Sequence, residues 1–196
     1  MRKILLSTAF AALIAAPSVA SAQAIPSAVV AVVDLEKVSS QCNACKTAQA
    51  ALQGQVNALK SREQALTAPL KSEGQSIQTA IDALKGNQPD AALQNRVKAF
   101  QAKQQQGAQE LARQQQQIQR NQAYISQQVN AKLGPIYQQV MQRRGANMLV
   151  EIGNTLASGS ALDVTNDVLA ALNAALPSVA TTAPAQPAQQ QQPQGR

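Results

Sequence analysis

The longest pattern in the chain is a repeat of aliphatic residues with mostly heptad spacing, which runs through two Gln-rich segments. Residues 46–85 and 89–144 predict two long helices, and Gly86-Asn87-Gln88 predicts the turn between them. Pro89 suits the first turn of the second helix. Two helices joined by so short a turn pack antiparallel. The sequence therefore predicts a helical hairpin arm, about 60 Å long at roughly 1.5 Å per residue.

The repeat places one row of aliphatic side chains along the seam between the two helices, as in a coiled coil. Its positions are Leu52, Val56, Leu59, Leu66, Leu70, Ile77 and Leu84 in the first helix, and Leu93, Val97, Phe100, Leu111, Ile118 and Ile125 in the second. Polar or small residues interrupt the seam at Glu63, Glu73, Ala80, Gln104, Gly107, Gln114 and Asn121. Pro69 and Pro135 lack a backbone N–H and are expected to kink their helices. The pattern indicates a flexible arm.

Short β-type segments flank the arm. Residues 29–34 form a continuous β-branched run typical of a buried strand, and residues 148–152 predict a second strand. Gly153-Asn154 predicts a hairpin turn that leads to a partner strand at residues 155–158. Thr165 is expected to cap a short amphipathic helix. The apolar face of that helix is formed by Val168, Leu169, Leu172 and Leu176.

These segments define the predicted architecture. Residues 25–45 and 145–176 form a β-rich body of about 50 residues, a size at which domains usually need disulfides, metals or oligomerisation. The fold class is α+β, with the body as an oligomerisation module and residues 46–144 as the helical arm, its tip near residues 86–89. Residues 177–196 are rich in Pro, Ala and Gln and are predicted to be disordered.

The first residues resemble an export signal. Met1-Arg2-Lys3 is basic, residues 4–16 are apolar, and small residues offer cleavage after Ala22 or Ala24. The apolar run is shorter than the about 20 residues that a membrane-spanning helix needs. Residues 1–24 are therefore interpreted as a signal peptide, which predicts an exported protein located in the bacterial periplasm.

Charge is distributed unevenly along the chain. Between Lys46 and Arg144 there are 13 basic and 5 acidic residues, so the arm is cationic. Such a surface suits anionic partners, namely acidic polypeptides, anionic lipid or lipopolysaccharide. Nucleic acid is not expected, because an exported protein seldom meets it and the arm has few aromatic residues on which bases stack.

Cys42-Asn43-Ala44-Cys45 is the one motif with candidate covalent chemistry. In an oxidising compartment it is a redox centre, a structural disulfide or a buried pair of free thiols, and the sequence leaves these alternatives open. The chain contains no His, which excludes haem attachment through CxxCH and argues against zinc. We predict no catalytic residue, no metal site and no cofactor.

The order of these motifs resembles one known family. The chain has AVVDLEKV at residues 31–38, a basic helical hairpin, LVEI at residues 149–152, and a segment from Asp163 through Thr165 to Leu169. This last segment is similar to the pattern D-[IV]-T-x-[DE]-[VI]-[LI] of the Skp/OmpH family of periplasmic chaperones. The resemblance implies a homotrimer whose three helical tentacles enclose a cavity, as in prefoldin. It also implies that unfolded outer-membrane proteins are held there without ATP.

A holdase of this kind is not an enzyme, and its contacts with a client are diffuse. The candidate residues for contact with a client or another anion are the arm cations Lys98, Lys103, Arg113 and Arg120. Two other functions are considered. One is a thiol–disulfide oxidoreductase that uses residues 42–45, although the βαβ context of a thioredoxin motif is missing. The other is a passive periplasmic coiled-coil adaptor or spacer, which is expected to keep its seam apolar.

Overall fold

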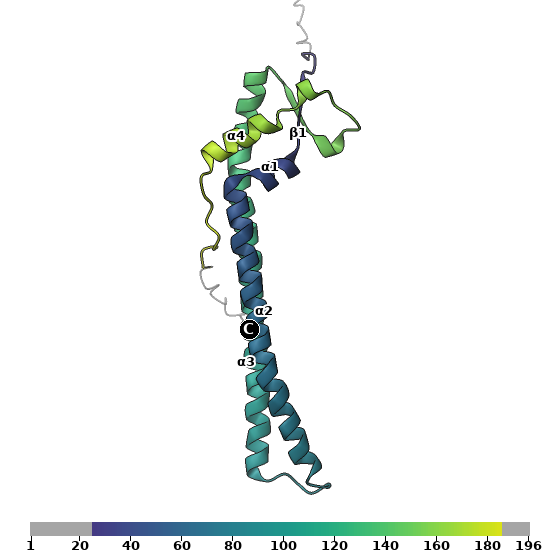
Figure 1. Ribbon diagram of the computed structural model, residues 1–196, viewed down its shortest axis with the longest axis vertical. Coiled ribbons are helices and arrows are strands. Elements are labelled where there is room, and N and C mark those ends of the chain that lie inside the picture. The colour runs from purple at the N-terminus through teal and green to yellow at the C-terminus, as the bar shows by residue number, and fades with distance from the viewer. Residues whose placement is uncertain (1–24, 186–196) are drawn as a thin grey trace, which may run out of the picture.

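The computed structural model describes residues 25–185. The predicted signal peptide, with its cleavage sites after Ala22 and Ala24, lies outside the described residues, as do residues 186–196. The elements are, in order, β1 (Val30–Val33), α1 (Leu35–Gln41), α2 (Asn43–Asp82), α3 (Ala91–Arg144), β2 (Met148–Glu151), 3₁₀ turns at Ile152–Asn154 and Ser160–Leu162, and α4 (Thr165–Ala175). Figure 1 shows α2 and α3 as a long arm that projects from a small body. The α+β class with a helical hairpin is confirmed.

The arm helices begin at positions that their caps determine. The Asp90 carboxylate accepts a hydrogen bond of 2.8 Å from the N–H of Leu93, so α3 starts at Ala91 rather than at Pro89. The other helix, α2, starts at Asn43, three residues before the predicted Lys46. Between the helices, Gly86 has a φ of +90°, a conformation that glycine adopts without a steric penalty.

The seam between α2 and α3 follows the predicted positions. Ile77 and Ile125 are buried, and the other aliphatic seam residues are half-buried, except Val56, which is 45 % exposed. Two interrupting positions, Gly107 and Asn121, are buried as well. The arm is therefore held together by a mixed apolar and polar seam, which gives less hydrophobic stabilisation than a continuous aliphatic one.

The two prolines that were predicted to kink the arm lie inside continuous helices. Pro69 is within α2 and Pro135 is within α3. In Figure 1 the tip-side half of α2 runs at an angle to the half near the body, as the missing backbone hydrogen bond at Pro69 leads one to expect.

The sheet of the body differs from the sequence prediction. β1 pairs with β2 in parallel, with Val30 opposite Met148 and Val33 opposite Glu151. The predicted hairpin is wrong: Gly153 and Asn154 belong to a 3₁₀ turn, and residues 155–158 form no strand. The reason is that the arm brings the chain back to the body, where β1 is already available as a partner. A long crossover of this kind is what a parallel pair requires.

The predicted cap of α4 is also wrong. Thr165 is the first residue of the helix and Val164 precedes it, without a side-chain cap. The Thr165 hydroxyl instead accepts a hydrogen bond of 2.9 Å from the N–H of Asp34, which lies 131 positions away. The Thr165 side chain therefore forms a tertiary hydrogen bond instead of the predicted helix cap.

The core of the body lies between the sheet, α1, α4 and the upper ends of α2 and α3 (Figure 1). The predicted apolar face of α4 is confirmed, because Val168, Leu172 and Leu176 are buried and Leu169 is half-buried. The largest fully buried side chains are Leu172, Val32, Val38, Val140, Val168, Thr165 and Cys42.

The chain after α4 does not leave the fold at once. Leu176 is buried, Val179 packs against the core, and residues 180–183 form hydrogen bonds with the arm. The prediction of disorder from Pro177 onward therefore does not hold for residues 177–185.

Candidate functional site

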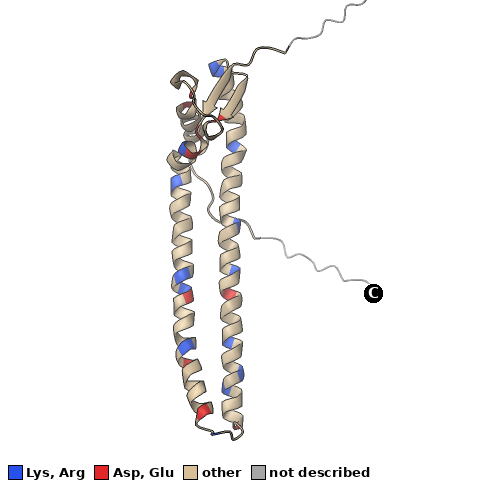
Figure 2. Cartoon of the chain, turned by 90° about the vertical axis from the view of Figure 1, so that its right-hand side faces the viewer, with Lys and Arg blue, Asp and Glu red and all other residues tan. Residues whose placement is uncertain are grey.

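The four candidate cations lie on α3 in different environments. Lys98 and Arg113 are exposed and form no ion pair within residues 25–185. The Lys103 Nζ atom is 2.8 Å from Glu73 Oε2 on α2. Arg120 is half-buried and donates a hydrogen bond to Gln117 of the same helix. Figure 2 shows basic residues spaced along both arm helices, so the surface is a series of separated cations.

A second ion pair ties the arm helices together. Arg62 on α2 contacts Glu110 on α3 at 2.7 Å, through Nε and Oε1. The hydrogen bond from Arg62 lowers the pKa of Glu110, and the same contact raises the pKa of Arg62. Because the pair is solvated, it contributes little to stability.

Two hollows, each lined by apolar residues together with polar or charged ones, lie between the arm helices. One, of about 400 Å³, lies where the arm meets the body and is lined by residues that include Leu52, Ile125, Val129, Leu133 and Tyr137. Burial raises the pKa of the Tyr137 hydroxyl. The other, also about 400 Å³, lies beside Leu66, Pro69 and Leu70. Each is large enough for an aliphatic or aromatic side chain, and both are open to solvent.

Cys42 and Cys45 form a disulfide, with their Cα atoms 5.1 Å apart. Cys42 lies at the junction of α1 and α2, is 0 % exposed, and its Sγ accepts a hydrogen bond from the N–H of Cys45. A reactive redox cysteine is accessible and stabilised as a thiolate. Cys45 is half-buried and lines the hollow where the arm meets the body. The complete burial of Cys42 nevertheless favours a structural disulfide over a redox centre.

Reduction of this disulfide is expected to lower the free energy of unfolding by about 2 kcal/mol, the loop-closure contribution for a four-residue loop. The measurement is denaturant unfolding with and without reductant. Cys42→Ala/Cys45→Ala is the control, and reductant should leave its midpoint unchanged. The structural role would be contradicted if the disulfide form of the protein efficiently oxidised a test dithiol.

Asp163 and Thr165 join the start of α4 to the sheet. The Asp163 Oδ1 atom accepts a hydrogen bond of 2.8 Å from the N–H of Thr165, and the Asp163 backbone forms an isolated parallel β-bridge with Val32 of β1. The hydrogen bonds from the side chain and the backbone of Thr165 lower the pKa of Asp163 from 3.8. The two residues of the sequence signature thus have a structural role in the body.

The lowered pKa of Asp163 predicts a pH-dependent contribution to stability. The ionised carboxylate stabilises the fold above pH 3.8, and this contribution is lost as the pH falls through the lower, folded-state pKa. Asp163→Asn should destabilise the protein by less than about 1 kcal/mol at neutral pH, since solvent screens an exposed carboxylate. The difference should shrink below about pH 4, as measured by urea unfolding across pH. An identical difference at every pH would contradict this assignment.

Sequence reasoning missed one set of contacting residues, namely Gln55, Asn121 and Gln128. Their side-chain amides contact the chain at residues 180–183. The available signal was Asn121 at a seam position, because a buried amide there requires hydrogen-bond partners. Gln55 and Gln128 could not be distinguished in sequence from the many other Gln residues of the arm.

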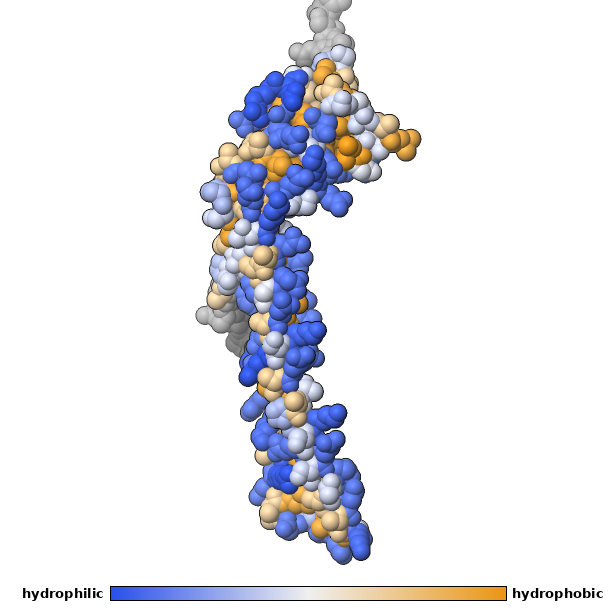
Figure 3. Space-filling view, viewed as in Figure 1, coloured by the Kyte–Doolittle hydropathy of each residue, from blue (hydrophilic) through white to orange (hydrophobic). Residues whose placement is uncertain are grey.

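Large apolar side chains are exposed on the body. Leu156 is fully exposed, Val29 and Met148 are about half exposed, and Leu162 is 41 % exposed. Figure 3 shows hydrophobic residues gathered on the side of the body that projects beyond the arm. The body is small and its sheet has only two strands. Its exposed apolar side chains form a surface of the kind that another chain covers.

The geometry defines a class of protein: a small α+β body that projects one long, cationic two-helix arm. A family model described as outer membrane protein (OmpH-like) matches residues 29–172. The chain therefore belongs to the OmpH-like family. No helix within residues 25–185 is long and apolar enough to cross a membrane.

Solved structures with a similar fold include the following one. It is a protein from Caulobacter crescentus CB15, described as an OmpH-like outer membrane chaperone, with a TM-score of 0.66 and 19 % sequence identity. The match covers 80 % of this chain and 90 % of that one. The search of curated proteins found no matching sequence.

Proposed function

We propose that this protein is an ATP-independent holdase chaperone of the periplasm that binds unfolded outer-membrane proteins and prevents their aggregation. The observation that carries the proposal is the arm, which combines exposed cations such as Lys98 and Arg113 with shallow, partly apolar hollows between its helices. Membership of the OmpH-like family supports it. Holding a client in this way needs no catalytic residue.

The binding mechanism follows from the spacing of these features. Cations attract an acidic unfolded polypeptide over a long range, and the hollows accept its apolar side chains one at a time. Each contact is weak, but several contacts with one client raise the total affinity. Because no single contact is strong, the client can dissociate from each of them quickly. The same cations suit the headgroups of anionic lipid or lipopolysaccharide as a second class of partner.

The assembly in this proposal is a homotrimer in which the bodies pack together and three arms surround a cavity. Exposed Leu156, Met148 and Val29 on the body support this arrangement, because burying them between chains removes apolar surface from water. The second edge of β2, which is not paired within residues 25–185, is available for the same contact.

The test is size-exclusion chromatography with light scattering on the mature protein, alone and mixed with a urea-unfolded outer-membrane β-barrel. We expect a mass of three chains, and a soluble complex that also contains the barrel. A monomer, or a trimer beside which the barrel aggregates, would overturn the proposal. If the protein were a passive adaptor or spacer, we would expect a trimer beside which the barrel aggregates.

The alternative function as a thiol–disulfide oxidoreductase is less well supported. Its only candidate residues are Cys42 and Cys45, which are joined in a disulfide. Cys42 is fully buried, so only the half-buried Cys45 sulfur is open to attack by a substrate thiol.

A further inference from the structure

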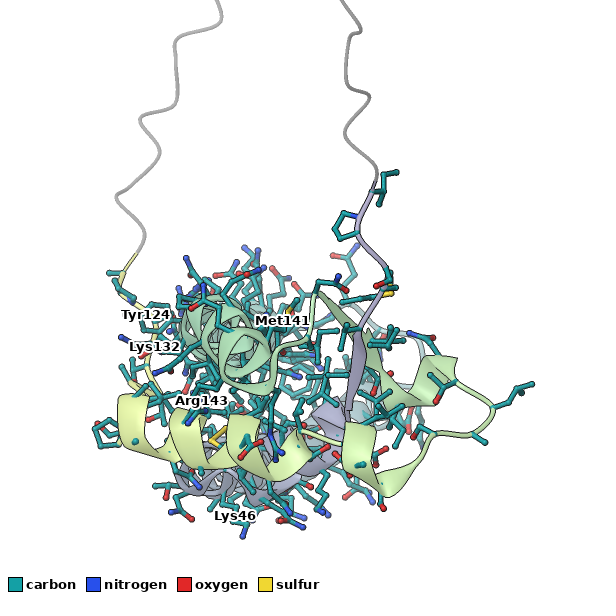
Figure 4. The ribbon with its side chains drawn as sticks, turned by 90° about the horizontal axis from the view of Figure 1, so that it is seen from above. Lys46, Tyr124, Lys132, Met141 and Arg143 are labelled. Atoms are coloured by element: carbon teal, nitrogen blue, oxygen red, sulfur yellow. A yellow bond between two sulfur atoms is a disulfide. The ribbon has the colours of Figure 1, made fainter. Side chains whose placement is uncertain are left out.

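The segment that follows α4 runs down the side of the arm as a strap. Residues 177–185 form neither helix nor strand, and they lie beside α2 and α3 (Figure 1). Seen along the arm in Figure 4, the strap lies on the side of α3 where Tyr124 and Lys132 are labelled. Buried Leu176 and half-buried Val179 attach its start to the core of the body. The strap is therefore positioned at one end by packing and along its length by the contacts described next.

Gln128 contacts both main-chain groups of a single strap residue. Its Nε2 donates a hydrogen bond of 2.9 Å to the carbonyl oxygen of Ala180, and its Oε1 accepts one of 2.9 Å from the N–H of Ala180. A side-chain amide has a donor and an acceptor side by side, as a neighbouring strand does. Gln128 therefore pairs with the strap in the way that a strand pairs with a strand.

Two more amides extend this pairing. Gln55 Nε2 donates to the carbonyl oxygen of Thr181 at 3.2 Å, and Asn121 Oδ1 accepts from the N–H of Ala183 at 2.8 Å. Asn121 Nδ2 also donates to Gln55 Oε1 at 2.8 Å, which links α3 to α2. Asn121 is only 3 % exposed, and its Oδ1 also accepts a hydrogen bond of 2.7 Å from Gln117 Nε2, so this buried amide is held in place within the arm.

All four strap hydrogen bonds end on the main chain. The side chains of Ala180 and Ala183 have no polar atom, and the Thr181 hydroxyl is not used in any of these bonds. The site thus recognises peptide groups, which every polypeptide has, rather than a particular sequence. An unfolded polypeptide presents the same groups unpaired, whereas a folded one has used them in its own secondary structure.

We propose that Gln55, Asn121 and Gln128 form a main-chain-binding site for unfolded polypeptide, which the chain's own residues 180–183 occupy until a client displaces them. This inference rests on the proposed holdase function and adds a specific site to it. While no client is present, the strap occupies hydrogen-bonding groups of all three amides, of which Asn121 is buried and Gln55 and Gln128 are half-buried. Because it is tethered, its effective concentration is on the order of millimolar, so only a client that binds at several points displaces it.

The direct test is amide hydrogen exchange of the full mature protein, with and without a urea-unfolded outer-membrane β-barrel. The protected amides of Ala180 and Ala183 should exchange about tenfold faster in the complex, since displacement removes their hydrogen bonds. Aggregation of the barrel is followed in the same samples. A soluble complex with unchanged protection at both amides would overturn the inference and leave the holdase function standing. An aggregating barrel would overturn both.

Two matched pairs of variants test the chemistry of the site. Gln128→Met keeps the length of the side chain but removes both hydrogen bonds, so it should release the barrel at least about fivefold faster, as expected from two bonds of roughly 0.5–1.5 kcal/mol each. Gln127→Met alters an exposed neighbour that has no strap contact and should release it at the wild-type rate. Equal release from the two variants would contradict the site.

The second pair tests whether the main chain is what the site recognises. Ala180→Pro removes the N–H donated to Gln128 and should abolish the protection of Ala183. Thr181→Val keeps every main-chain group and should retain that protection. Loss of protection in Thr181→Val would show that the side chain is recognised, and would overturn the proposal of a sequence-independent site.

Discussion

Leu172→Ala is expected to lower the free energy of unfolding by about 2–5 kcal/mol, the largest stability effect among our predictions. Leu172 is 0 % exposed and lies in α4, among the core residues of the body. Truncation to Ala removes buried aliphatic carbon and leaves a cavity that the surrounding helices and sheet fill only in part. Since the body is small, this loss is a large share of its total stability.

The measurement is urea unfolding at fixed protein concentration, because an oligomer's stability depends on concentration. Ile81→Ala is the matched control, since Ile81 is a similar aliphatic residue on the arm and is 40 % exposed. It should cost well under half as much as Leu172→Ala. Equal losses from the two variants would show that α4 does not contribute to the cooperative core.

Replacement of Lys98, Lys103, Arg113 and Arg120 with Gln is expected to slow capture of an acidic unfolded barrel about tenfold at low salt. The four substitutions remove half of the surplus positive charge of the arm. At roughly 0.01 M salt the Debye length is about 30 Å, so the cations act on an approaching client, and at about 1 M it is only about 3 Å. The difference in rate should therefore disappear as salt increases.

Stopped-flow association rates measure this effect, with thermal unfolding as a check on the arm. The check is needed because Lys103 pairs with Glu73 and Arg120 contacts Gln117, so two of the four substitutions also remove contacts within the arm. The control exchanges each Lys for Arg and each Arg for Lys, which keeps the charge. Unchanged capture rates at every salt concentration would remove the electrostatic part of the mechanism.

The arm was predictable because its information is local. Aliphatic residues at heptad spacing form a continuous stripe on a helix, and a short turn forces two such helices to pack on each other. Ile77 and Ile125 are buried where that spacing predicts. Cap chemistry moved the helix ends by a few residues, as at Asp90.

The pairing of the body was not predictable from local pattern. Residues 148–158 have the composition of a hairpin, but β2 pairs in parallel with β1, which precedes it by more than 100 positions. Thr165 likewise has the identity of a helix cap, but its hydroxyl bonds to Asp34. In both cases a distant partner satisfied the hydrogen-bonding groups that a local partner was expected to satisfy.

The sequence by itself determined the helical hairpin, its excess of positive charge and the apolar face of α4, because periodicity and composition act between residues that are close along the chain. Only the tertiary structure decided the parallel sheet, the burial of Cys42 and the docking of residues 180–183 on Gln55, Asn121 and Gln128. Those features depend on which distant groups meet once the arm has folded back. Main-chain groups are the same in nearly every residue, so a main-chain hydrogen bond cannot be predicted from the type of residue that donates it.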